Sequence, residues 1–180
     1  MRSEEMSLQD AESLQKGDWI VHKQHGVGQI KAIEEKKIGS KIHQYFRVSI
    51  SDGVYWLPVE KVPDYVRSVS SQNKFHQVLE LIGEMPEKLQ RDYKERNKTI
   101  SAQLEDTTLE TKGTLIRDLD AWRRLEGVNL SALNERQLIS LKKQFLREMT
   151  IVFEIEMDRA EEKLRNALEK SFAKLESTAV

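Results

Sequence analysis

The spacing of apolar residues changes once along this chain, near residue 70, and that change predicts a β part followed by an α part. Before it, short runs rich in β-branched and aromatic residues predict strands. These runs cover residues 19–21, 27–33, 45–50 and 54–59. Glycines separate the runs, and Asp52-Gly53 is a strong signal for a tight hairpin. Short strands with short connections predict a small antiparallel barrel of SH3 or Tudor type.

After residue 71 the apolar residues recur at helical spacing. A first helix is predicted around Phe75 to Ile82, a second from Pro86 onward, and a third that ends at Gly127. Ser131 is the predicted N-cap of a fourth helix. No proline or glycine follows Gly127, so a long C-terminal helix is predicted to run to the terminus, unbroken or with a bend. The predicted class is α+β, with a Tudor-like barrel over residues 14–70 and an all-α domain over 71–180.

Composition restricts the kinds of function. The 180 residues are 33% charged and carry a formal net charge of −1, so any nucleic-acid binding requires a local basic patch. The absence of cysteine excludes disulfides and thiolate zinc sites. No apolar run is long enough to span a membrane, and the N-terminal residues lack an apolar signal core, so we expect a cytoplasmic protein that does not bind membranes.

The stretch HGVGQI, residues 25–30, raises two chemical alternatives, a metal site and a phosphate loop. His22 and His25 lack a third ligand nearby in the sequence, so no metal is predicted. Gly26 and Gly28 are followed by a strand rather than a helix and lack the other residues of a nucleotide loop. We therefore interpret both glycines as residues that let the chain turn between two strands.

Catalytic residues cannot be identified in the sequence. It has no nucleophile elbow, and its carboxylates mostly alternate with Lys and Arg in the predicted helices. We predict a protein that is not an enzyme, with no cofactor and no small-molecule substrate.

Two local basic clusters lie in the predicted helices. Residues 85–99 hold five basic and three acidic residues, and an ordinary solvated helix face or a phosphate-binding face would both produce this pattern. The second cluster consists of Arg123, Arg124, Lys142, Lys143 and Arg147. A basic face could therefore exist within a nearly neutral chain.

Several motifs occur in the order of a known family. The N-terminal motifs are Gly17-Asp18-Trp19-Ile20-Val21, His25-Gly26-Val27-Gly28, Ile33-Glu34, Tyr45 and Leu57-Pro58-Val59. The helical motifs are Phe75-His76-Gln77-Val78-Leu79, Arg91-Asp92-Tyr93-Lys94, Arg117-Asp118-Leu119, and Leu130-Ser131 with Glu135 and Leu138. Over residues 14–150 the chain resembles the CarD family of bacterial transcription regulators, whose N-terminal module also occurs in the transcription-repair coupling factor.

The resemblance implies a regulator with two binding surfaces. Its N-terminal module would dock on the RNA polymerase β subunit, with Lys36, Tyr45, Tyr55 and Trp56 as contacts. Its helical domain would bind promoter DNA at the upstream edge of the bubble and stabilise the open complex, through Leu89, Arg91, Tyr93, Lys94, Arg123 and Arg124. Trp56 stands where an arginine is usual in the family, and Leu89 stands where the family has a tryptophan wedge.

Two further alternatives follow from these departures and from the chain length. Leu89 and the near-neutral charge favour a protein-protein adaptor on RNA polymerase that does not bind DNA directly. The residues after about 150 extend beyond the family length, and they would pack along the helical domain or form a homodimer through the C-terminal helix.

Overall fold

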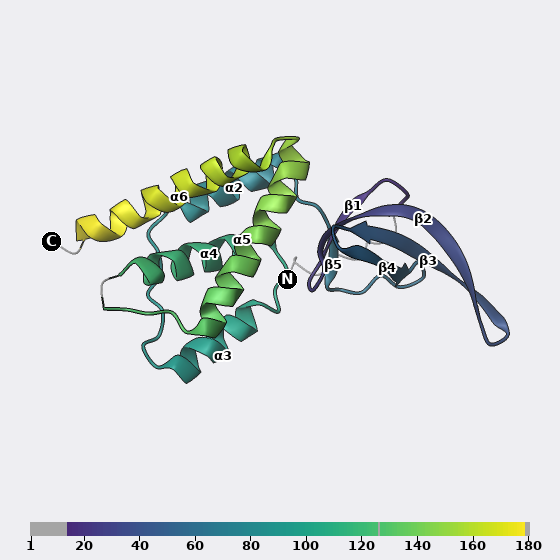
Figure 1. Ribbon diagram of the computed structural model, residues 1–180, viewed down its shortest axis with the longest axis horizontal. Coiled ribbons are helices and arrows are strands. Elements are labelled where there is room, and N and C mark those ends of the chain that lie inside the picture. The colour runs from purple at the N-terminus through teal and green to yellow at the C-terminus, as the bar shows by residue number, and fades with distance from the viewer. Residues whose placement is uncertain (1–13, 126, 179–180) are drawn as a thin grey trace, which may run out of the picture. The chain divides into compact units, whose positions relative to one another are not determined.

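The computed structural model describes residues 14–125 and 127–178, which divide into two compact units between Val69 and Ser70 (Figure 1). The first unit contains an antiparallel sheet and the second contains five helices. This arrangement confirms the predicted α+β class.

Five strands form the sheet of the first unit. They are β1 (Trp19–His22), β2 (Gly26–Ile38), β3 (Lys41–Ile50), β4 (Gly53–Pro58) and β5 (Val66–Ser68). Their order is β4-β3-β2-β1-β5, so within the described residues β4 and β5 are the two edges and the sheet is not a closed barrel. Asp52 and Gly53 lie at the predicted hairpin, where Ile50 pairs with Gly53. The buried face holds Ile20, Ile30, Phe46, Val48, Leu57 and Val66.

Two features of the sheet differ from the sequence prediction. The segment Val66–Ser68, where no strand was predicted, forms β5 and pairs with β1. Gly28 lies inside β2 opposite Ile20 rather than in a turn, whereas Gly26 has the positive φ of 71° that the prediction required. A Cβ on Gly28 would lie 2.7 Å from Val48 Cγ1, so Gly28 allows close packing and does not turn the chain.

The second unit consists of five helices around one apolar core. They are α2 (Gln72–Ile82), α3 (Tyr93–Gln103), α4 (Leu109–Arg124), α5 (Ala132–Phe153) and α6 (Met157–Thr178). The side chain of Ser131 accepts a hydrogen bond from the backbone of Asn134, which confirms the predicted N-cap of α5. Phe75 and Phe145 pack edge to face in the core, with ring centroids 5.3 Å apart.

The helix predicted from Pro86 instead begins at Tyr93, where Asp92 caps the helix by accepting from Lys94 N and Glu95 N. Of the two predicted alternatives for the C-terminal region, the unbroken helix is not formed, because Glu154 adopts a left-handed conformation with φ 52° and ends α5.

Helix α6 then returns across the unit and lies beside α2 in Figure 1. Its buried residues Ala160, Leu164 and Leu168 belong to the core cluster. These three residues of α6 therefore pack within the helical unit, as one of the two predicted alternatives for the C-terminal residues requires. No helix in the described part of the chain combines the length and apolar character needed to cross a membrane.

Candidate binding surfaces

One face of the sheet brings together Lys36, Tyr45 and Trp56. The strand register places Glu34 opposite Tyr45, and Arg47 opposite Trp56, so these four side chains share a face. The ammonium of Lys36 lies 3.7 Å from the centroid of the Trp56 ring and 5.6 Å from that of Tyr45. These distances indicate a cation–π contact, which holds Lys36 over the tryptophan.

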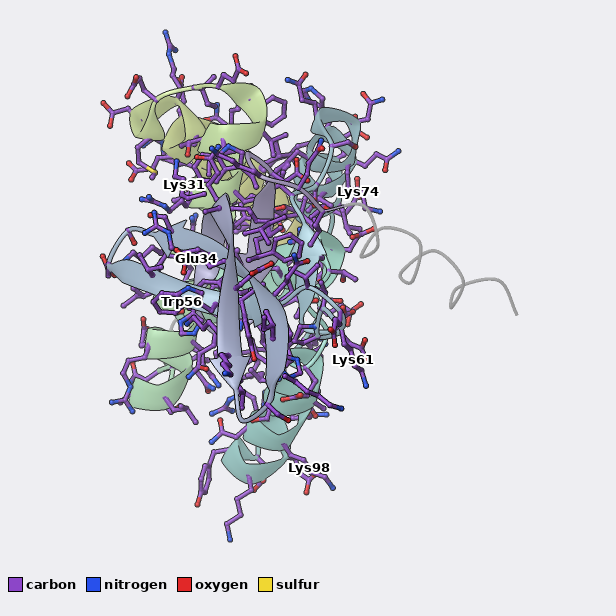
Figure 2. The ribbon with its side chains drawn as sticks, turned by 90° about the vertical axis from the view of Figure 1, so that its right-hand side faces the viewer. Lys31, Glu34, Trp56, Lys61, Lys74 and Lys98 are labelled. Carbon is purple, nitrogen blue, oxygen red and sulfur yellow. The ribbon has the colours of Figure 1, made fainter. Side chains whose placement is uncertain are left out.

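Glu34 binds the indole N–H of the same ring. Trp56 Nε1 donates a hydrogen bond of 2.7 Å to Glu34 Oε2, and Figure 2 shows Glu34 and Trp56 on neighbouring parts of the sheet. Arg47 Nε lies 3.4 Å from the other carboxylate oxygen of Glu34. Trp56 nevertheless remains 42% exposed. The face therefore presents an aromatic ring held in a defined orientation and open to a partner.

Tyr55 lies on the opposite face, because adjacent residues in a strand point to opposite sides. Its ring stacks on His25 with centroids 4.8 Å apart and packs edge to face with His22. Its hydroxyl is buried and has no hydrogen-bond partner among the described residues. Burial raises the pKa of Tyr55 to about 12. The structure thus separates Tyr55 from Lys36, Tyr45 and Trp56.

His22 stabilises the turn between β1 and β2. Its Nδ1 accepts hydrogen bonds from the backbone N–H of Gln24, at 3.0 Å, and of His25, at 3.2 Å. Burial, and then the neighbouring His25, lower the pKa of His22 to about 4. Within residues 14–125 and 127–178, no group of three or more His, Asp or Glu side chains could hold a metal ion. The His22 side chain therefore has a structural role in this turn.

The residues predicted to contact DNA near α3 fall into two environments. Arg91, Tyr93 and Lys94 are exposed at the start of the helix, and Tyr93 is 56% exposed. Leu89 instead packs against the core cluster. The structure places the first three together at the surface, whereas Leu89 is partly buried.

Buried charges hold the segment before α3 in place. Arg96, which the sequence grouped with the surface cations, is buried and donates through Nη1 to the carbonyls of Gln90 and Arg91, at 2.8 and 3.1 Å. Asp118 accepts from Glu87 N at 2.9 Å, and burial raises the pKa of this carboxyl group. No motif in the sequence indicates these contacts, so neither Arg96 nor Asp118 was predicted to be structural.

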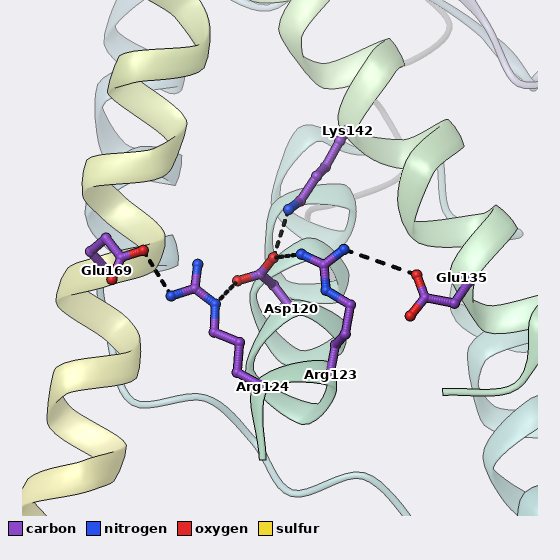
Figure 3. Close-up of polar contacts among 6 residues, drawn as sticks. All are labelled: Asp120, Arg123, Arg124, Glu135, Lys142 and Glu169. Carbon is purple, nitrogen blue, oxygen red and sulfur yellow. Dashed lines mark hydrogen bonds and ion pairs between the residues drawn. The ribbon is translucent and has the colours of Figure 1, made fainter. Parts of the chain in front are cut away.

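Arg123 and Arg124 converge on the carboxylate of Asp120, together with Lys142 from α5 (Figure 3). The nitrogen–oxygen distances are 2.9 Å for Arg123, 2.7 Å for Arg124 and 2.6 Å for Lys142. The Asp120 side chain is only 2% exposed. The i,i+3 and i,i+4 spacing from Asp120 to the arginines was a signal in the sequence for this internal pairing.

Acidic residues surround this network. Arg124 also pairs with Glu169 of α6 at 2.8 Å, and Arg123 lies 4.0 Å from Glu135 of α5. The network links α4, α5 and α6, so much of the positive charge of Arg123 and Arg124 is neutralised within the protein. The predicted DNA contacts at these two positions thus fall in a structural network.

Comparison with known proteins identifies relatives of both units. Residues 14–70 match the CarD-like/TRCF RID domain family. The transcription-repair-coupling factor of Rickettsia prowazekii (strain Madrid E) is 32% identical over 68 residues, which are 37% of this chain and 6% of that protein. The Bacillus subtilis (strain 168) protein named Putative transcription factor YdeB is 26% identical over 133 residues, which are 72% of this chain and 85% of the relative.

Proposed function

We propose that the chain is a CarD-like transcription regulator that binds RNA polymerase through its sheet and promoter DNA through its helical unit, because residues 14–70 match the CarD-like/TRCF RID domain family. In this proposal the sheet docks on the polymerase β subunit, and the helical unit contacts DNA at the upstream edge of the bubble and stabilises the open complex. The match over residues 14–70 is the observation that carries it.

The geometry of Trp56 supports the docking half of this proposal. Exposed aromatic side chains that are already held in place dominate many protein interfaces, because little conformational freedom is lost on binding. Trp56 is held by Lys36 and Glu34, and it lies on the edge strand β4. A strand edge can also pair with an extended segment of a partner. Trp56 is therefore our proposed anchor, in place of the arginine that is usual in the family.

Capture of core RNA polymerase by the immobilised full chain tests this half. We expect Trp56→Ala and Lys36→Ala each to weaken capture about tenfold or more, as loss of an interface anchor does. Lys37→Ala is the matched control, because Lys37 is an exposed neighbour on the opposite face. Wild-type binding that is absent at micromolar concentration, or equal losses in all three variants, would contradict the proposal.

Arg91, Tyr93 and Lys94 support the DNA half. The two cations are exposed and suited to phosphates, and the exposed ring of Tyr93 can stack on an unpaired base. Leu89 packs on the core, so we assign the bubble-edge contact to Tyr93 rather than to Leu89. We expect the double variant Arg91→Ala with Lys94→Ala to shorten the lifetime of the open complex. A lifetime equal to that of the wild type would show that these contacts are misassigned.

The alternative is an adaptor that binds polymerase without touching DNA. The net charge of −1 and the internal pairing of Arg123 and Arg124 favour it. A gel-shift experiment with forked promoter DNA at low salt separates the two proposals. A shift supports the DNA-binding regulator, and its absence supports the adaptor.

A further inference from the structure

Helix α5 carries a second basic surface that is distinct from the segment at Arg91 and Lys94. The helix has six charged residues, which are Glu135, Arg136, Lys142, Lys143, Arg147 and Glu148. Three of them make contacts within the protein. Lys142 pairs with Asp120, Glu135 lies near Arg123, and Glu148 is fully buried and accepts from Ser70 N at 2.8 Å.

The remaining three charges, Arg136, Lys143 and Arg147, are all positive and exposed. Steps of seven and four residues bring side chains back to the same side of a helix, which here is the side away from the buried Leu138, Leu141 and Phe145. No hydrogen bond or ion pair joins these three side chains to another residue of the described chain. Both acids of α5 are engaged elsewhere, so this face has positive charge without neighbouring negative charge on its own helix.

We propose that the α5 basic face, formed by Arg136, Lys143 and Arg147, binds the phosphate backbone of duplex DNA. The three residues span about 16 Å along the helix axis, so each can reach a different phosphate of a duplex that carries charge all along its length. Exposed Ser140 lies between Arg136 and Lys143 and adds a hydroxyl donor, another group that commonly contacts phosphate.

The first turn of α5 packs on α3 through the buried side of the helix. Asn134, at the start of α5, donates to Asn97 Oδ1 at 3.1 Å and accepts from Arg96 Nε at 3.3 Å. Figure 1 shows the start of α5 lying next to α3. The α5 basic face lies on the other side of α5 from this contact, so it offers phosphate contacts separate from those proposed at Lys94. The inference rests on the proposed function and adds a sequence-independent contact to it.

The test measures the affinity of the full chain for a fluorescent duplex of mixed sequence as the salt concentration is varied. The first variant is Arg136→Gln with Lys143→Gln and Arg147→Gln. The matched control is Arg159→Gln with Lys163→Gln and Arg165→Gln, which removes the same charge from exposed positions on α6. Glutamine preserves helix propensity, and circular dichroism checks that the helices remain folded.

We expect the α5 variant to lower the slope of log affinity against log salt by about 2–3, since each lost phosphate contact contributes about 0.9. The control should keep the wild-type slope. An unchanged slope in the α5 variant overturns the inference, and so do equal losses in both variants, which would reflect bulk charge alone. Loss of binding to polyglutamate with an unchanged DNA slope would assign the face to an acidic protein and also overturn it.

The variant Arg91→Ala with Lys94→Ala, measured in the same assay, separates this inference from the proposed function. If that variant loses affinity and the α5 variant does not, the inference fails and the proposed bubble contact stands. If the wild type does not bind the duplex even at about 50 mM salt, where phosphate contacts are strong, the inference fails together with the DNA half of the proposal. Polymerase capture then still tests the docking half.

Discussion

At the scale of single residues, Gly28 occupies a position where a side chain does not fit. A Cβ there would lie 2.7 Å from Val48 Cγ1 and 3.1 Å from the Ser49 carbonyl oxygen. We expect Gly28→Ala to destabilise the chain by about 1–3 kcal/mol, the usual cost of overpacking. Urea unfolding followed by fluorescence measures this. Gly53→Ala is the control, because nothing lies within 4 Å of a Cβ at Gly53. An equal effect at both positions would show that Gly28 is not tightly packed.

His22 should make stability depend on pH. Its folded pKa of about 4 lies below the ordinary 6.5, so a proton binds the unfolded chain more tightly. The stabilisation is present above pH 6.5 and is lost as the pH falls through 4. Between pH 7 and 5 we expect a loss of about 1–2 kcal/mol from this group. Urea midpoints at the two pH values measure it, and His22→Gln should reduce the difference whereas His76→Gln should not. A wild-type midpoint that does not change with pH would refute this role.

At the scale of helices and strands, Asp120 joins α4 and α5 through one carboxylate, and Arg124 extends the network to α6 through Glu169. Removing its charge leaves Arg123, Arg124 and Lys142 without their shared partner. Loss of one partner from a buried ion pair costs about 3–5 kcal/mol, but these cations are partly exposed, so we expect about 1–3 kcal/mol for Asp120→Asn. Thermal unfolding measures the loss. Asp158→Asn, an exposed change in the first turn of α6, is the control and should cost less than about 1 kcal/mol, the usual contribution of an acid at a helix N-terminus.

Local chemistry was enough to predict some elements of the fold but not others. The N-cap at Ser131 and the hairpin at Asp52-Gly53 depend on a few neighbouring residues, and the structure has both. The start of α3 was misplaced by seven residues, from Pro86 to Tyr93, because contacts from Arg96 and Asp118 hold the preceding segment. Strand β5 was missed because its pairing with β1 is long-range.

Some of the candidate binding residues were predicted correctly to lie together, and others were not. The resemblance selected Lys36, Tyr45 and Trp56, which the structure brings together on one face. It also selected Tyr55, which the alternation of the strand places on the other face. The i,i+3 and i,i+4 spacing from Asp120 indicates its pairing with Arg123 and Arg124, but neither the resemblance nor local charge could show that this carboxylate is buried and shared with Lys142, because that depends on the packing of α4 against α5 and α6.

At the scale of the whole molecule, the two compact units carry separate proposed surfaces. We therefore expect Trp56→Ala to weaken polymerase capture without changing affinity for duplex DNA. The double variant Arg91→Ala with Lys94→Ala should do the reverse. The test measures polymerase capture and affinity for duplex DNA for the wild type and for both variants. Loss of both activities in either variant would show that the units do not act independently.

The sharing of Asp120 by three cations also has an evolutionary consequence. A mutation that neutralises residue 120 would leave the repulsion among the positive charges at 123, 124 and 142 without an offsetting carboxylate. Later loss of one of these cations would then become favourable. In the opposite order, loss of one cation first leaves the Asp120 carboxylate with two partners. That first substitution should therefore destabilise the chain less than neutralising residue 120 does. The four positions should therefore show epistasis, in which the effect of each substitution depends on the order in which the others arose.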